Sequence, residues 1–175
     1  MKLKWHRAGL VVVTASMLMG SLAGCVPLVV GGGAMATALV ASDRRTSGIY
    51  LEDERIEQSA SARLRDQLKE GSRVSVTSFN RLVLVTGEVR TAEEKAVVER
   101  AVAGVENVRN VINEVHVVPF ISSITQRSKD TFITSKVKAS IIDAKDLQAN
   151  TIKVVTDMQI VYLMGIVTAR EAKRA

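Results

Sequence analysis

The stretch Leu82-Val83-Leu84-Val85-Thr86-Gly87-Glu88-Val89 leads almost directly into Thr91-Ala92-Glu93-Glu94, and these two segments decide the fold. The first is rich in β-branched and aliphatic residues and predicts a strand, in which Gly87 indicates a bulge or a close backbone approach. The spacing Thr91-x-x-Glu94 is typical of a capping box that opens a helix, and Gly104 is placed to end that helix. A strand followed by a helix indicates a mixed α and β domain.

The flanking segments extend this unit in both directions. Apolar residues four apart, separated by charged residues, predict an amphipathic helix over residues 53–69. Residues 74–77 alternate and predict a short strand, joined to the next strand by a turn at residues 78–81, and residues 105–118 supply a last strand. The resulting unit, over residues 51–119, has the order α-β-β-α-β, with both helices free to cover one face of a small sheet.

The same pattern returns later in the chain. At an offset of 78 residues Val83 falls on Val161, Gly87 on Gly165 and Glu93 on Glu171, and at an offset of 77 Ile56 falls on Ile133. We therefore expect a second α+β unit over residues 126–175. It ends before any counterpart of residues 97–117, so we expect it to lack its second helix and third strand. Either it is a shortened form or another chain completes it.

The first 24 residues have the features of an export signal. Lys2, Lys4 and Arg7 precede an apolar stretch over residues 8–21, which is too short to span a hydrocarbon core of about 30 Å. Leu22-Ala23-Gly24-Cys25 follows and contains the chain's single cysteine. An alternative is a buried cysteine within an uncleaved helix.

The segment ending at Cys25 resembles the lipobox of bacterial lipoproteins. This resemblance implies diacylglycerol on the Cys25 thiol, cleavage after Gly24 and acylation of the new amine, with palmitate as a typical acyl group. Val26 in place of Asp after the cysteine implies the outer membrane as the destination, on its periplasmic face. Residues 25–50 then form a tether that is flexible at its glycines, or that contains a short helix on the bilayer over residues 34–41.

Composition argues against several function classes. The net charge of +6 falls to +3 without residues 1–24, which weakens the case for a nucleic-acid partner. A single cysteine excludes an intramolecular disulfide, and the histidines His6 and His116 have no cysteine partner for a zinc site. His116 lies in an alternating strand and is expected to face solvent. We therefore expect no catalytic residues, no metal and no cofactor, and a protein that is not an enzyme.

The first repeat resembles the BON domain, a small module of periplasmic osmotic-stress and secretin-associated proteins. The resemblance lies in Gly87 and in the segment Gly104-Val105-Glu106-Asn107-Val108-Arg109-Asn110-Val111-Ile112. Lys129-Asp130-Thr131-Phe132-Ile133-Thr134-Ser135-Lys136-Val137, with Tyr162-Leu163-Met164-Gly165, is similar to the second domain of the dual-BON outer-membrane lipoproteins of the DolP type. The resemblance implies two tandem BON modules that support envelope integrity, with recruitment to the division site. Gly87, Gly104 and Gly165 are expected to have structural roles.

The basic excess of the chain lies in the second repeat. Residues 26–118 carry a net charge of −1, whereas residues 119–175 carry +4. On the first helix of that repeat Phe132 has Lys129 three residues before it and Lys136 four after it, an arrangement that suits an anionic lipid surface. The alternative is that Phe132 packs against the first repeat or against the missing strand.

The family resemblance implies contact with anionic phospholipid, such as phosphatidylglycerol or cardiolipin, through this helix. Carried over by position, it implicates Phe132, Ile133, Lys136, Lys138 and Ser140. A second function also stays open, in which the BON domains are protein-interaction modules whose partners are other envelope proteins.

Overall fold

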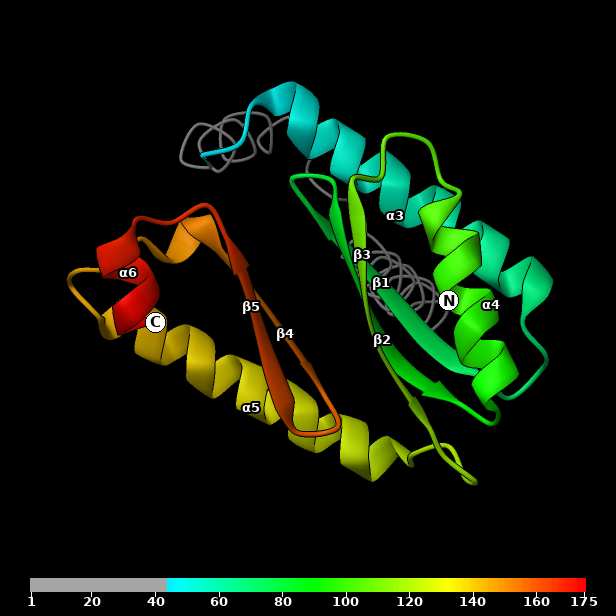
Figure 1. Ribbon diagram of the computed structural model, residues 1–175. Helices are drawn as coiled ribbons and strands as arrows, with labels where there is room; N and C mark the ends of the chain where they lie inside the picture. Colours follow the sequence, from blue (N-terminus) through cyan, green and yellow to red (C-terminus); the bar gives the residue numbers. More distant parts are fainter. Residues whose placement is uncertain (1–43) are drawn as a thin grey trace, which may run out of the picture. The chain divides into compact units, whose positions relative to one another are not determined.

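The computed structural model describes residues 44–175, which fold into helices and two small sheets (Figure 1). The predicted signal peptide, Cys25 and the glycine-rich part of the tether lie outside the described residues. The elements are α3 (Ser47–Gln67), β1 (Arg73–Phe79), β2 (Leu82–Val89), α4 (Ala92–Ala103), β3 (Asn110–Val117), α5 (Ile124–Asp143), the short 3-10 helix η2 (Ala149–Thr151), β4 (Ile152–Asp157), β5 (Ile160–Gly165) and α6 (Ala169–Arg174). The predicted α+β fold class is confirmed.

The first repeat is a three-stranded sheet with α3 and α4 on one face (Figure 1). β1 and β2 form an antiparallel hairpin, whereas β3 runs parallel to β2 after the crossover through α4. Asn80 and Arg81, at the hairpin turn, have φ angles of 54° and 63°, as a tight turn that follows the twist of the strands requires. The core between sheet and helices is almost entirely aliphatic and contains Ile56, Ala60, Leu64, Val83, Val85, Val98, Val102 and Val115.

Gly87 allows β1 and β2 to come close together. It has φ of +129° and pairs with Val74, and a Cβ atom there would lie 2.0 Å from the Arg73 carbonyl oxygen. No other residue type fits this position without displacing the strand. The glycine of the second repeat is similarly confined, because a Cβ on Gly165 would lie 2.8 Å from the Thr151 carbonyl oxygen.

The boundaries of three elements differ from the sequence expectation. β1 extends to Phe79, which pairs with Leu82, so the turn is formed by Asn80 and Arg81 alone and not by residues 78–81. α3 begins at Ser47, inside the segment assigned to the tether, because the Thr46 side chain caps it by accepting a hydrogen bond from Ile49 N. β3 begins at Asn110 and not at residue 105. The intervening loop contains Asn107 at φ of 65°, and Val105 is buried against the core.

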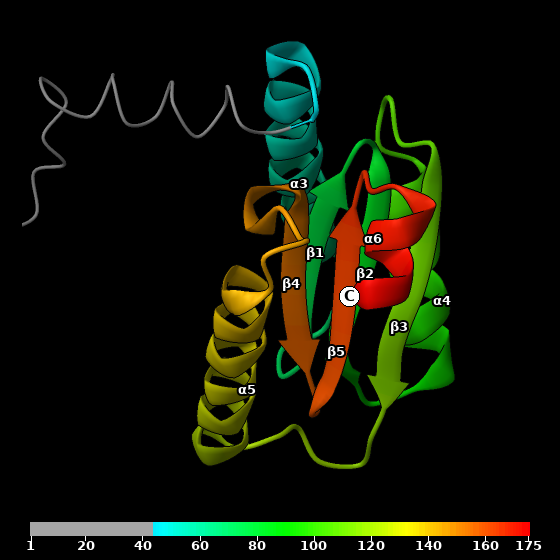
Figure 2. The ribbon, with the colours of Figure 1, turned by 90° about the vertical axis from the view of Figure 1, so that its left-hand side faces the viewer.

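The second repeat has the antiparallel pair β4 and β5, with α5 packed along the sheet (Figure 2). Thr134 Oγ1 and Thr156 Oγ1 are joined by a hydrogen bond of 2.8 Å between α5 and β4. The face of this sheet away from α5 contacts the first repeat. There Met164 packs with Phe79 and Leu84. The first repeat therefore uses one sheet face for α3 and α4 and the second repeat one sheet face for α5, and each uses the other face for its neighbour.

The expectation that the second repeat lacks a second helix is wrong, because α6 occupies that place, whereas the described sheet of this repeat has two strands and no third, as expected. Thr168 caps α6, and Glu171 accepts a hydrogen bond from Thr168 N at 2.7 Å, which completes a capping box. Thr168 and Glu171 match Thr91 and Glu94 at an offset of 77, so the alignment of Glu93 with Glu171 is also corrected. In α4 the box is incomplete, since Glu94 accepts from Arg90 N.

None of the helices described is both long enough and apolar enough to span a bilayer.

Candidate functional site

α5 is fixed to the second repeat by a buried residue in its first half and another near its end. Asp130 is 6% exposed, and its Oδ1 accepts a hydrogen bond of 2.8 Å from Gln159 N in the β4–β5 turn. Ile141 is buried with 6% exposure. With these contacts on one side, the opposite side of a 20-residue helix is left for solvent or a partner.

Phe132 lies on that free side. Its side chain is 61% exposed, and Lys136 Nζ lies 4.9 Å from the centre of its ring, within range of a cation–π contact. Phe132 is therefore not packed against the first repeat. An exposed aromatic ring next to an ammonium group is well suited to the boundary between lipid headgroups and acyl chains.

The other residues implicated by the resemblance differ in their placement. Lys129, Lys136, Lys138 and Ser140 are exposed, whereas Ile133 is half-buried. At about 100° per residue, Lys129 and Lys136 lie within roughly 60° of Phe132 around the helix, but Lys138 lies about 120° away on the other side. The structure thus groups Phe132 with Lys129 and Lys136 and separates Lys138 from them.

Two further exposed apolar residues widen this face. Ile124 and Ile142 are exposed to 73% and 68%, at opposite ends of α5. They are about five turns of 3.6 residues apart, so they point in the same direction, about 80° around the helix from Phe132. We call Ile124, Phe132 and Ile142 the apolar stripe. The five-turn spacing was the available sequence signal, but the exposure of these residues depends on how α5 packs.

Hydroxyl groups between these apolar residues are bonded within the helix. Ser128, Thr131 and Ser135 each donate to the carbonyl oxygen four residues earlier, at 3.1, 3.1 and 3.0 Å. A hydroxyl that already has an internal acceptor loses less on leaving water than a free one. The stripe is therefore less costly to move into a headgroup layer than its composition indicates.

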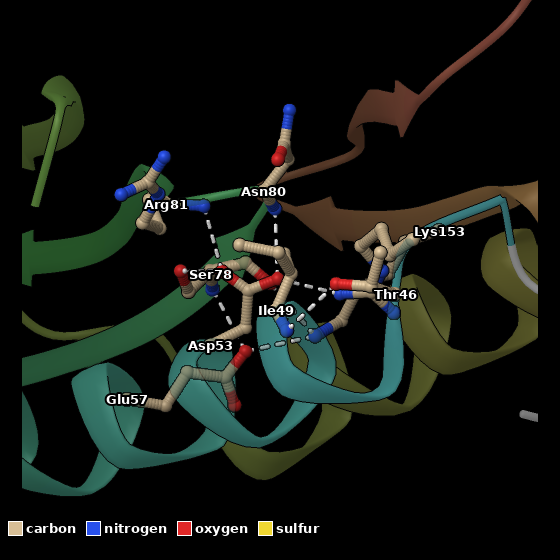
Figure 3. A network of polar contacts seen from close by, with 9 residues as sticks. Thr46, Ile49, Asp53, Glu57, Ser78, Asn80, Arg81 and Lys153 are labelled. Carbon is tan, nitrogen blue, oxygen red and sulfur yellow. Dashed lines mark hydrogen bonds and ion pairs between the residues drawn. The ribbon is translucent and has the colours of Figure 1, made fainter. Parts of the chain in front are cut away.

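A cluster of polar contacts surrounds Asp53 on α3 and has a structural role (Figure 3). The Asp53 carboxylate is 2% exposed and accepts hydrogen bonds of 2.7 Å from Ser78 Oγ, Asn80 N, Arg81 N and Arg45 Nη1. Burial alone would raise the pKa of Asp53, but the four donors outweigh it and lower the pKa below its usual value. Asp53 thus holds the β1–β2 turn against α3.

Asp130 is the counterpart of Asp53 in the second repeat, at the offset of 77. Both carboxylates accept an N–H from the left-handed turn of their own hairpin, Arg81 N for Asp53 and Gln159 N for Asp130. The sequence analysis assigned no role to either residue and so missed this one. The signal was present in the repeat alignment, in which one aspartate falls on the other.

The expectation that His116 faces solvent is wrong. The residue is half-buried, and its Nε2 has no hydrogen-bond partner among the described residues. It pairs with Glu88 on the sheet face away from α3 and α4, where Ser122 covers the Glu88 carboxylate. Within residues 44–175 no group of three His, Cys, Asp or Glu residues is placed to hold a metal ion.

Comparison with known protein families shows that both repeats match the same family. The model of the BON domain matches residues 52–119 and residues 129–175, segments that begin near the start of α3 and within α5. The chain belongs to the BON domain family. Phe132 and Ile142 of the apolar stripe therefore lie within the second BON segment, and Ile124 precedes it on the same helix.

Two known proteins are similar in sequence to this chain over most of its length. Outer membrane lipoprotein DolP of Haemophilus influenzae is 39% identical over 156 residues, which is 88% of this chain and 80% of the relative. The 21 kDa hemolysin of Actinobacillus pleuropneumoniae is 30% identical over 135 residues, 76% of this chain and 69% of the relative. The expected resemblance to BON lipoproteins of the DolP type is confirmed.

Proposed function

We propose that this BON protein is a non-enzymatic outer-membrane lipoprotein, anchored through Cys25 on the periplasmic side, that binds anionic phospholipid through α5. In this role it helps to maintain the integrity of the cell envelope, including at the division site. Its similarity to an outer membrane lipoprotein supports the location. The observation that carries the lipid assignment is the exposed Phe132 ring in contact with Lys136 on a basic helix.

Apolar and basic residues on one face of α5 make separate contributions to membrane binding. The apolar stripe supplies area that leaves water on entering the headgroup boundary, at about 25 cal/mol per Å² of apolar surface. Lys129 and Lys136 flank Phe132 and meet lipid phosphates, each contributing about 1 kcal/mol near an anionic surface. The acidic residues of α5 do not oppose this contact at Phe132, because Asp130 is buried and Asp143 is at the C-terminal end.

The test is cosedimentation of the whole mature chain, carrying Cys25→Ser so that no acyl group contributes, with vesicles. We expect binding to vesicles that contain phosphatidylglycerol or cardiolipin, weakening at high salt, and none to neutral phosphatidylcholine vesicles. Phe132→Glu should abolish this binding. Leu51→Glu is the matched control, because Leu51 is an equally exposed apolar residue, at 67%, on α3 of the first repeat.

Unchanged vesicle binding by Phe132→Glu would overturn the proposed site. A loss of crosslinking to another envelope protein, with vesicle binding intact, would favour the protein-interaction function instead.

A further inference from the structure

A cavity of about 510 Å³ lies between the two repeats, bounded by α3 and β1 on one side and by α5 and β4 on the other. Its volume is within the range of about 300–1,000 Å³ that small-molecule sites occupy. Polar and apolar residues share the lining, and the apolar ones come from both repeats, with Tyr50 and Phe79 from the first and Ile141, Ile142, Ile152 and Val154 from the second. Aliphatic and aromatic walls of this kind suit a hydrocarbon chain.

Two of the charged groups in the lining are already neutralised by carboxylates. Arg45 pairs with the buried Asp53 at 2.7 Å, and its guanidinium lies over the Phe79 ring at 4.2 Å. Lys153 pairs with Glu57 at 2.8 Å. These cations hold the walls together and are not free to bind a ligand's charge.

The remaining charges of the lining are Lys138 on α5 and Glu54 on α3, and both side chains are exposed. Neither forms an ion pair or hydrogen bond within residues 44–175. They place one unpaired cation and one unpaired anion at the edge of a cavity that also has an aliphatic and aromatic part. A ligand that fits needs a hydrocarbon chain and a headgroup with both charges.

We infer that this cavity, which we call the inter-repeat cleft, binds a single-chain zwitterionic amphiphile such as lysophosphatidylethanolamine. Its acyl chain lies between Phe79 and Ile152, its phosphate meets Lys138, and its ammonium group meets Glu54. The cleft is distinct from the Phe132 surface, since Lys138 is on the other side of α5 from Lys136, and only Ile142 borders both. It also calls for a zwitterionic headgroup, whereas the stripe favours anionic lipid.

The experiment is calorimetric titration of the whole mature Cys25→Ser chain with short-chain lysophosphatidylethanolamine below its critical micelle concentration. We expect saturable binding of one molecule per chain. Asn150→Trp, which places an indole into the lining from an exposed position, should remove the binding. Gln58→Trp, at an exposed amide side chain outside the cleft, is the control, and unchanged thermal unfolding of both variants shows that they fold.

The headgroup assignment has its own variants. Lys138→Gln and Glu54→Gln should each weaken binding about two- to fivefold, as expected for exposed ion pairs, whereas Lys145→Gln should not. Lysophosphatidylglycerol should bind more weakly than lysophosphatidylethanolamine, and Glu54→Gln should strengthen its binding. Tighter binding of lysophosphatidylglycerol by the unaltered chain would overturn the assignment.

Different experimental results would overturn the cleft and the vesicle-binding face. Phe132→Glu should leave the titration unchanged while it abolishes vesicle binding. Absence of saturable binding, binding that survives Asn150→Trp, or binding lost with Phe132→Glu would each overturn the inter-repeat cleft as a site.

Discussion

Arg44 binds Glu171 through two parallel hydrogen bonds of 2.8 Å, although the two residues are 127 positions apart in the sequence. The next residue, Arg45, binds Asp53 of the first repeat. Two adjacent arginines, immediately before α3, are thus attached to different BON segments. The bidentate geometry is the strong form of an arginine–carboxylate contact. The beginning of the described chain is therefore tied to both repeats.

The Arg44–Glu171 contact makes the free energy of unfolding depend on pH. The hydrogen bonds from Arg44 and Thr168 lower the pKa of Glu171 from 4.5 to about 2. A carboxylate with a depressed folded pKa stabilises the fold fully above its ordinary pKa, and that contribution is lost as pH falls from about 4.5 toward 2. Urea unfolding from pH 7 to pH 2 should show that the stability advantage over Glu171→Gln narrows in that range. A constant difference at all pH values would contradict it.

Replacement of Asp53 should be the most damaging change to a polar side chain of the first repeat. Asp53→Ala leaves Ser78 Oγ, two turn N–H groups and Arg45 without their acceptor, so we expect a loss of about 3–5 kcal/mol in the free energy of unfolding. Glu54→Ala, at the exposed neighbouring position, should cost less than about 0.5 kcal/mol. Denaturant titration monitored by circular dichroism measures both, and a similar loss for the two would refute the structural role.

Gly87→Ala should destabilise the first sheet severely. The new Cβ would lie 2.0 Å from the Arg73 carbonyl oxygen, at a φ of +129° that side chains rarely adopt, so about 4 kcal/mol or more should be lost. Gly48→Ala is the control, because nothing lies within 4 Å of that position in α3, and it should be neutral or stabilising by up to about 1 kcal/mol. Thermal unfolding distinguishes the two. A Gly87→Ala protein as stable as the parent would show that β1 and β2 can separate there.

Docking of the repeats through Arg73 and Asp157 predicts an energetic coupling between them. Arg73 Nη2 lies 2.8 Å from Asp157 Oδ1 and 2.9 Å from Glu88 Oε2, and both carboxylates are mostly buried. A double-mutant cycle with Arg73→Gln and Asp157→Asn should give a coupling of about 1–3 kcal/mol in urea unfolding. Arg55 and Glu106, an exposed pair within the first repeat at 3.3 Å, should give less than about 1 kcal/mol. Additive effects of the first two substitutions would mean that the repeats are not docked in solution.

The ends of the apolar stripe should contribute to vesicle binding. Ile124→Ser and Ile142→Ser each remove an exposed aliphatic side chain, and each should weaken partitioning to phosphatidylglycerol vesicles roughly fivefold, about 1 kcal/mol. Neither should change the unfolding midpoint by more than a few degrees, since neither is buried. If only Phe132 matters, the contact is confined to the middle of α5 and the stripe is not used as a whole.

Local patterns were sufficient for much of the fold. The strand Leu82–Val89 and the helix Ala92–Ala103 follow the expected boundaries, because alternation, the Thr91 cap and Gly104 act over neighbouring residues. The second repeat was detectable for the same reason, since each copy carries its own hairpin and helix signals. The exposed Phe132 between two lysines was likewise readable from helical spacing.

Burial and long-range pairing were decided only when the repeats packed together. His116 alternates like a solvent-facing residue, yet it is half-buried because its sheet face carries Glu88, Arg73 and the second repeat. Arg44 gives no local sign that its partner is Glu171, and the cleft exists only because α5 and β4 lie against α3 and β1. Helix and strand periodicity states which side chains share a face, but the free energy that selects a partner for that face comes from surfaces distant in the chain.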